Sequence, residues 1–85
     1  MEDYENALEY FQQALRIEEH RQSAKDLKLA TAYYNMSKAA EGAQKYEAAR
    51  LYAENALREA EKIVAANDPT LRKYRDYFHR LYSED

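Results

Sequence analysis

Apolar side chains recur at intervals of three and four residues in four separate stretches of the chain. This spacing places them on one face of an α-helix, because helical turns bring residues i, i+3, i+4 and i+7 to the same side. The pattern predicts four helices, near residues 3–20, 24–41, 45–66 and 69–82. We therefore expect an all-α fold without β-strands, in which the second helix packs against both the first and the third.

Signals for helix ends lie between these stretches. Ser23 and Asp26 resemble a capping box at the start of the second helix. Gly42 is the residue type that most readily adopts the left-handed backbone conformation, so we expect it to close that helix in a tight turn. Asp68 is placed to cap the fourth helix, with Pro69 at its first position, where a missing N–H group costs nothing.

The chain contains an internal repeat with a period of 42 residues. A shift by this distance superposes the first predicted helix on the third, and the apolar positions of the second on those of the fourth. Half of residues 4–19 are identical to their counterparts: Tyr4/Tyr46, Glu5/Glu47, Ala7/Ala49, Tyr10/Tyr52, Ala14/Ala56, Leu15/Leu57, Arg16/Arg58 and Glu19/Glu61. A period of this length is typical of stacked helical arrays.

The segment "DLKLATAYYNMSKAAEGAQKYEAARLYAENALREAEKIVAANDP", residues 26–69, resembles one complete tetratricopeptide repeat of the long, 42-residue type found in kinesin light chains and many bacterial proteins. The family's usual form has an "LATxYNNL" first helix, a "GKYEEAExLYxxAL" second helix and an Asp-Pro entry to the next repeat. The resemblance implies a right-handed array of antiparallel helices over residues 1–85. This single domain would consist of half a repeat, one full repeat and another half repeat.

Some positions depart from the family pattern or carry a packing argument. Met36 and Ser37 stand where the family usually has Leu-Gly or Leu-Ala, and Gly42 comes two residues before the family's turn glycine. Ala49 and Ala56 belong to a ladder of small residues, which should let two helices approach closely. We expect a larger side chain at either position to overpack this contact.

Composition and charge exclude several classes of function. The chain has 13 basic and 16 acidic side chains, a net charge of −3 and no cysteine, which argues against nucleic-acid binding and disulfides. No apolar run is long enough for a signal peptide or a membrane span, so we expect a cytoplasmic protein without membrane contact. His20 and His79 have too few ligand partners nearby for a metal site. We predict no cofactor and no enzymatic activity.

A second stripe of side chains, mostly polar, lies on the face of the second and fourth helices that the predicted core does not use. In tetratricopeptide proteins the first helix of each repeat lines a concave surface that binds extended peptides, and an Asn placed like Asn35 commonly bonds the peptide backbone. The resemblance thus implies a groove formed by Tyr34, Asn35, Lys38, Lys73, Tyr77 and Arg80. Its charges suit a ligand with carboxylates and an aromatic or apolar anchor. A mixed polar stripe is equally typical of a solvated helix face.

In the predicted array, the first helix is the second half of one repeat and the last helix is the first half of another. This arrangement bears on self-association. Half repeats at both ends should leave apolar surface uncovered, because such repeats bury their faces only by stacking. The candidates are Leu8, Phe11 and Leu15 at one end and Tyr74, Phe78 and Tyr82 at the other. Either the chain is a piece of a longer array, natural or engineered, or these ends meet another copy in a homo-oligomer. The sequence predicts a non-catalytic protein-interaction module, with a structural self-assembly unit as the alternative.

Overall fold

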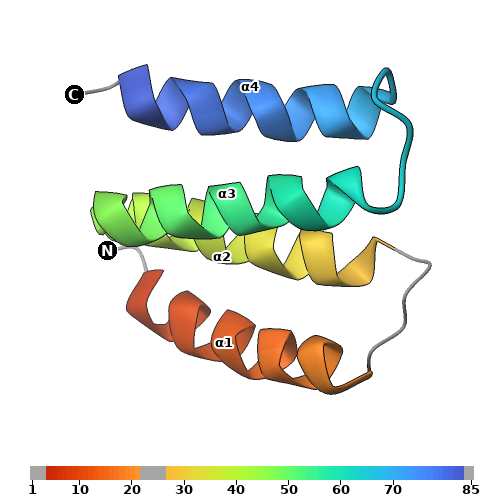
Figure 1. Ribbon diagram of the computed structural model, residues 1–85. Coiled ribbons are helices and arrows are strands. Elements are labelled where there is room, and N and C mark those ends of the chain that lie inside the picture. Colours follow the sequence, from red (N-terminus) through yellow and green to blue (C-terminus); the bar gives the residue numbers. More distant parts are fainter. Residues whose placement is uncertain (1–3, 22–26, 84–85) are drawn as a thin grey trace.

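The computed structural model describes residues 4–21 and 27–83, and these ranges contain four α-helices (Figure 1). α1 comprises Tyr4–Arg21, α2 Lys28–Gly42, α3 Tyr46–Glu61 and α4 Pro69–Ser83. None of the described residues belongs to a β-strand, so the prediction of an all-α fold is confirmed for this part of the chain. The predicted capping box of Ser23 and Asp26 lies outside the described residues.

Consecutive helices run in opposite directions, with α1 and α4 on opposite sides of the molecule and α2 and α3 between them (Figure 1). α2 packs against both α1 and α3, as predicted, and α3 packs against α4. The hydroxyl of Tyr33 on α2 donates a 2.9 Å hydrogen bond to Oε2 of Glu19 on α1. Burial raises the pKa of Tyr33 to about 12, and this hydrogen bond adds to the effect.

The core consists of two clusters, and each cluster combines side chains of α2, α3 and α4. The first cluster contains Ala30, Ala56, Ala60, Leu71 and Tyr74. The second contains Ala40, Ala49, Ala53, Tyr77 and Leu81. α3 contributes only alanines to both, and this lets α2 and α4 lie close to its backbone. The predicted burial of Ala49 and Ala56 is confirmed, since they are 0% and 1% exposed.

Ser37 is a polar residue at a buried position of α2. It is 0% exposed, and its hydroxyl donates a 2.6 Å hydrogen bond to the backbone oxygen of Ala49 on α3. A buried hydroxyl without such a partner would lower stability. The serine therefore links α2 to α3 at the point where the alanine ladder brings the two backbones together.

The turn between α2 and α3 differs from the prediction. Gly42 is still part of α2 and has no positive φ, whereas Gln44 has φ 64°. The amide of Lys45 donates to the oxygen of Ala40 (2.8 Å) and the amide of Gln44 to that of Glu41 (3.0 Å), which is the hydrogen-bond pattern of a Schellman motif. The assignment of the turn glycine to Gly42 is wrong, because this motif places the left-handed residue two positions later.

Replacing Gln44 by Gly should stabilise the protein by about 0.5–1 kcal/mol, because a side chain makes the left-handed conformation unfavourable. The free energy of unfolding in urea measures the change. Ala43→Gly is the matched control: Ala43 has φ −85°, where glycine offers no advantage, so this variant should be no more stable than the parent. A Gln44→Gly protein no more stable than Ala43→Gly would contradict the assignment of the left-handed residue.

The start of α4 agrees with the prediction, whereas the end of α3 does not. Oδ1 of Asp68 accepts a 2.8 Å hydrogen bond from the amide of Thr70, and Pro69 is the first residue of α4. α3 ends at Glu61, and turns follow over residues 62–67. None of the described helices combines the length and the apolar character that crossing a bilayer requires.

Candidate functional site

Two lysines and a tyrosine on neighbouring helices form a cationic cluster. Lys38 on α2 and Lys73 on α4 place their Nζ atoms 5.5 and 5.2 Å from the ring centre of Tyr34. Both distances fall in the range of a cation–π contact. The structure thus brings together three of the residues predicted to line a peptide groove, although Lys73 lies on another helix, far from Tyr34 and Lys38 in the sequence.

Tyr77 differs from the prediction that it faces a ligand. It is only 7% exposed and belongs to the second core cluster. The ring of Tyr34 stacks on Tyr74 at 4.7 Å and meets Tyr77 edge-on at 5.2 Å, so three aromatic rings fill the space between α2 and α4. Tyr77 therefore packs against the buried side of Tyr34 and is not available on the surface.

The hydroxyl of Tyr77 takes part in a network of polar contacts between the same two helices. It donates a 3.0 Å hydrogen bond to Oε1 of Glu41, and Nη1 of Arg80 lies 3.2 Å from Oε2 of the same carboxylate. Burial raises the pKa of Tyr77 to about 12; the hydrogen bond from Ser37 lowers it, and that to Glu41 raises it. Arg80 is thus engaged by Glu41, which makes it a weaker candidate for ligand binding than the two lysines.

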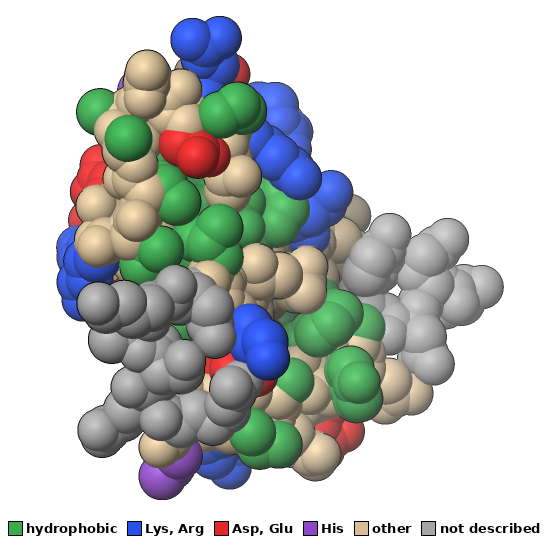
Figure 2. Space-filling model, turned by 90° about the vertical axis from the view of Figure 1, so that its right-hand side faces the viewer, with side chains coloured by type: hydrophobic (Ala, Val, Ile, Leu, Met, Phe, Trp, Pro, Cys, Tyr) green, Lys and Arg blue, Asp and Glu red, His purple; other side chains and the backbone are tan. Residues whose placement is uncertain are grey.

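Lys38 and Lys73 have no carboxylate partner among the described residues; the ring of Tyr34 is the contact found for both. Asn35 is half-buried, and its side-chain amide makes no hydrogen bond to the described part of the chain. Figure 2 shows Lys and Arg side chains gathered along the upper right edge of the molecule, and hydrophobic side chains at the surface in both its upper and lower halves. On the face shared by α2 and α4, Arg80 is therefore paired with Glu41, whereas Lys38 and Lys73 are not paired with a carboxylate of the described residues.

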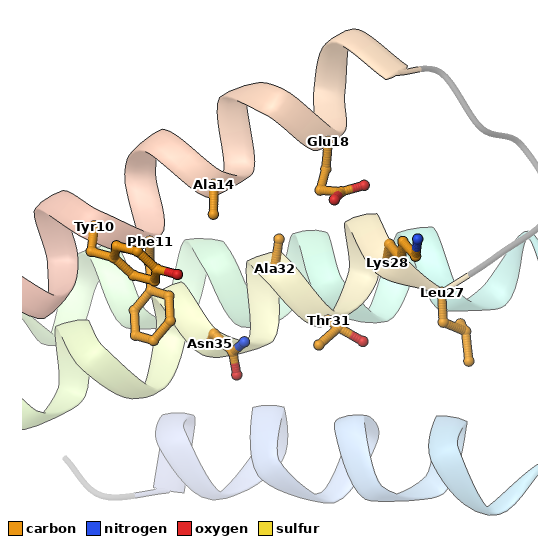
Figure 3. Close-up of a pocket in the computed structure, with 9 residues that line it drawn as sticks. All are labelled: Tyr10, Phe11, Ala14, Glu18, Leu27, Lys28, Thr31, Ala32 and Asn35. Atoms are coloured by element: carbon orange, nitrogen blue, oxygen red, sulfur yellow. The ribbon is translucent and has the colours of Figure 1, made fainter.

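A groove between α1 and α2 was not predicted from the sequence. Its first part is a pocket of about 430 Å³, and its second part a pocket of about 590 Å³. The first is lined by Tyr10, Phe11, Ala14, Glu18, Leu27, Lys28, Thr31, Ala32 and Asn35 (Figure 3). The second is lined by Ala7, Phe11, Asn35, Lys38, Ala39, Glu41 and Gly42. Phe11 and Asn35 belong to both, so the two pockets adjoin and form one groove along α1.

The residues predicted to form an oligomer interface fall into two groups. Leu15 and Tyr74 are 7% and 5% exposed, so they are part of the core and differ from the prediction of uncovered surface. Leu8, Phe11 and Phe78 are half-buried, and only Tyr82 is exposed. Among the described side chains of α1, the most exposed large apolar residues are instead Tyr10 and Ile17, at 67% and 62%.

The described residues offer no metal centre, since they contain no group of three or more His, Cys, Asp or Glu side chains that could hold an ion. His20 lies on the exposed end of α1, where its Nδ1 is 2.8 Å from the oxygen of Arg16. Ser37, the most buried serine among the described residues, donates its hydroxyl proton to the backbone oxygen of Ala49 and is no nucleophile candidate.

No protein-family model matches the chain, and no curated protein or solved structure matches it either. The resemblance to tetratricopeptide repeats therefore depends on the residues quoted above and on the 42-residue register. Two surfaces of the described residues are candidates for a function, the cationic cluster and the groove.

Proposed function

We propose that the chain is a non-catalytic protein-interaction module with the tetratricopeptide-like arrangement of half a repeat, one full repeat and half a repeat. In this proposal the face of α2 and α4 binds an extended peptide, and the protein acts in the cytoplasm. A chain without cysteine suits a reducing compartment. The resemblance and the antiparallel packing of the helices support the arrangement.

The observation that carries the proposal is the position of Lys38 and Lys73 over the ring of Tyr34. Two ammonium groups from different helices, without a carboxylate partner in the described residues, provide charge-assisted hydrogen bonds for an acidic ligand. Asn35 lies one helical turn before Lys38 and offers an amide for the backbone of the same peptide. The ligand class is therefore an acidic peptide with an aromatic or apolar anchor.

Replacing either Lys38 or Lys73 by Ala should weaken binding of an acidic peptide by about tenfold, because each charge-assisted hydrogen bond contributes roughly 1.5 kcal/mol. The probe is a labelled peptide of Asp and Glu with one central Trp, measured by fluorescence anisotropy. Asn35→Ala should weaken binding as well, with helicity unchanged in circular dichroism.

Lys62→Ala is the matched control, because Lys62 lies outside the cluster, in the turn after α3, and pairs with Glu59 of that helix. It removes the same charge and should leave the affinity unchanged. Equal losses for Lys62→Ala and Lys73→Ala would show a general charge effect. A footprint around Arg50, Glu54 and Arg58 would show that the peptide binds another face, and the groove assignment would fail.

Self-assembly is a second candidate function, and the exposure of Tyr10 and Ile17 favours it. They lie seven residues apart on α1, so they share one face of the helix. Burying both in a partner chain would contribute on the order of 3–6 kcal/mol before association costs. Sedimentation over a wide concentration range separates the two candidates: a 10.1 kDa monomer at every concentration contradicts self-assembly.

A further inference from the structure

The groove between α1 and α2 has a counterpart in the same chain. This counterpart is the surface formed by α3 and α4, and α2 covers it. The 42-residue register relates α1 to α3 and α2 to α4. In the two core clusters, Ala30 and Ala40 of α2 lie against side chains of both α3 and α4. The surface formed by α3 and α4 is therefore a binding surface for one helix.

The residues of this covered surface map onto the open groove with one exception. The covered residues are Ala49, Ala53, Ala56, Ala60, Leu71, Tyr74, Tyr77 and Leu81. Their counterparts 42 positions earlier are Ala7, Phe11, Ala14, Glu18, Leu29, Ala32, Asn35 and Ala39. All of these counterparts except Leu29 line one of the two adjoining pockets. In the described part of the chain, the position that α2 occupies over α3 and α4 is left open over α1 and α2.

The open groove resembles the covered surface, but its large and small side chains are exchanged between the two walls. Phe11 replaces Ala53 on the α1 side, whereas Ala32 and Ala39 replace Tyr74 and Leu81 on the α2 side. A helix bound there would thus lie closer to α2 than its counterpart lies to α4. The close-up shows Phe11 on α1 and Asn35 and Ala32 on α2 on facing sides of this space (Figure 3).

The helix that covers the counterpart surface defines the chemistry of the occupant. α2 contacts α3 and α4 through Ala30, Tyr34, Ser37 and Ala40, which recur at helical spacing on one face. Small residues at both ends of this face allow close approach, with one aromatic ring between them. The occupant is accordingly an amphipathic helix with small residues about ten positions apart.

A second copy of this chain does not offer such a helix in α4, although α4 is the repeat counterpart of α2. The positions equivalent to Ala30, Tyr34, Ser37 and Ala40 are Arg72, Asp76, His79 and Tyr82. Arg72, Asp76 and His79 are exposed in the structure. The groove walls that would face these groups are alanines, apart from Glu18, which already has a partner, and Asn35. Burying the charged and polar groups of α4 there is costly, so stacking of α4 onto the groove of another copy is disfavoured.

We propose that the groove between α1 and α2 is a docking site for an amphipathic α-helix of a partner protein that presents small residues to Phe11 and Ala32. This is a helix-in-groove mode of recognition. The groove shares Asn35 and Lys38 with the proposed acidic-peptide site. The class of ligand is different, however, and the proposal does not depend on that peptide.

The probe is a labelled synthetic peptide with the sequence of α2, residues 28–42, stapled between Thr31 and Lys38. Both side chains are exposed in α2 and lie outside the two core clusters, and the staple holds a helix too short to be stable alone. The contact of Thr31 with the hydroxyl of Tyr74 has no counterpart in the groove, because Ala32 stands at that position. The peptide should bind the full chain, with NMR shift changes centred on Ala14 and Ala32. A peptide with Ala30→Arg, the residue that α4 has at this position, should bind about tenfold more weakly.

In the full chain, Ala32→Arg should weaken binding of the stapled peptide by about tenfold or more, because the new side chain fills the groove. Ala14→Arg blocks the same space from α1 and serves if Ala32→Arg does not fold. Ala66→Arg, the same change in the exposed turn after α3, should have no effect. Lys73→Ala should leave binding of this peptide unchanged, because Lys73 does not line the groove. This variant therefore distinguishes failure of the acidic-peptide proposal from failure of the groove proposal.

Three results would overturn the proposal. The first is no binding of the stapled peptide to the parent chain in the millimolar range. The second is equal affinity of both groove variants and Ala66→Arg. The third is a dimer in sedimentation that Ala32→Arg converts to a monomer, since a second copy would then occupy the groove.

Discussion

Replacing Ala49 or Ala56 by Leu should lower the free energy of unfolding by about 1–3 kcal/mol. Both alanines are fully buried and lie in the two clusters where α3 meets α2 and α4. At Ala49 the added side chain would also displace the backbone oxygen that accepts the hydrogen bond of Ser37. We expect Ala49→Leu to be the more damaging of the two for this reason.

Urea unfolding followed by circular dichroism measures this effect. Ala66→Leu is the control, because Ala66 is exposed in the turn that follows α3 and a larger side chain meets no packed neighbour there. Surface substitutions of this kind usually change stability by less than about 0.5 kcal/mol. Midpoints of Ala49→Leu and Ala56→Leu equal to that of the parent would show that these positions do not lie at the close helix contact.

The number and order of helices could be predicted from the sequence because the apolar spacing and the 42-residue register agree with each other. The end of α3 could not. Ile63 and Val64 continue the apolar stripe beyond Glu61, and Val64 does pack against the first cluster, but from a turn. An apolar residue that follows a helix preserves the periodic pattern even where the helix has ended.

The site was harder to predict than the fold, since it depends on which helices are neighbours. Tyr34 and Tyr77 both lie on the stripe opposite the predicted core, but α2 and α4 approach each other there and bury Tyr77. The same limitation hid the groove: Ala14 and Ala32 look like core residues in the sequence, yet they become groove walls between α1 and α2. The 42-residue register is the signal that predicts the groove, because it relates the covered surface of α3 and α4 to the open surface of α1 and α2.

Leu71→Ala should destabilise the protein by about 2–5 kcal/mol, a large share of the stability that a small domain has. Leu71 is 2% exposed and lies in the first cluster, where three of the other four buried residues are alanines. Alanines have no side-chain freedom with which to fill a cavity, so the space left by the leucine should stay open. Leu51→Ala is the matched control, because Leu51 is 57% exposed on α3 and should lose less than about 0.5 kcal/mol. Urea midpoints measure both variants, and a Leu71→Ala protein as stable as Leu51→Ala would contradict the position of the first cluster at the core.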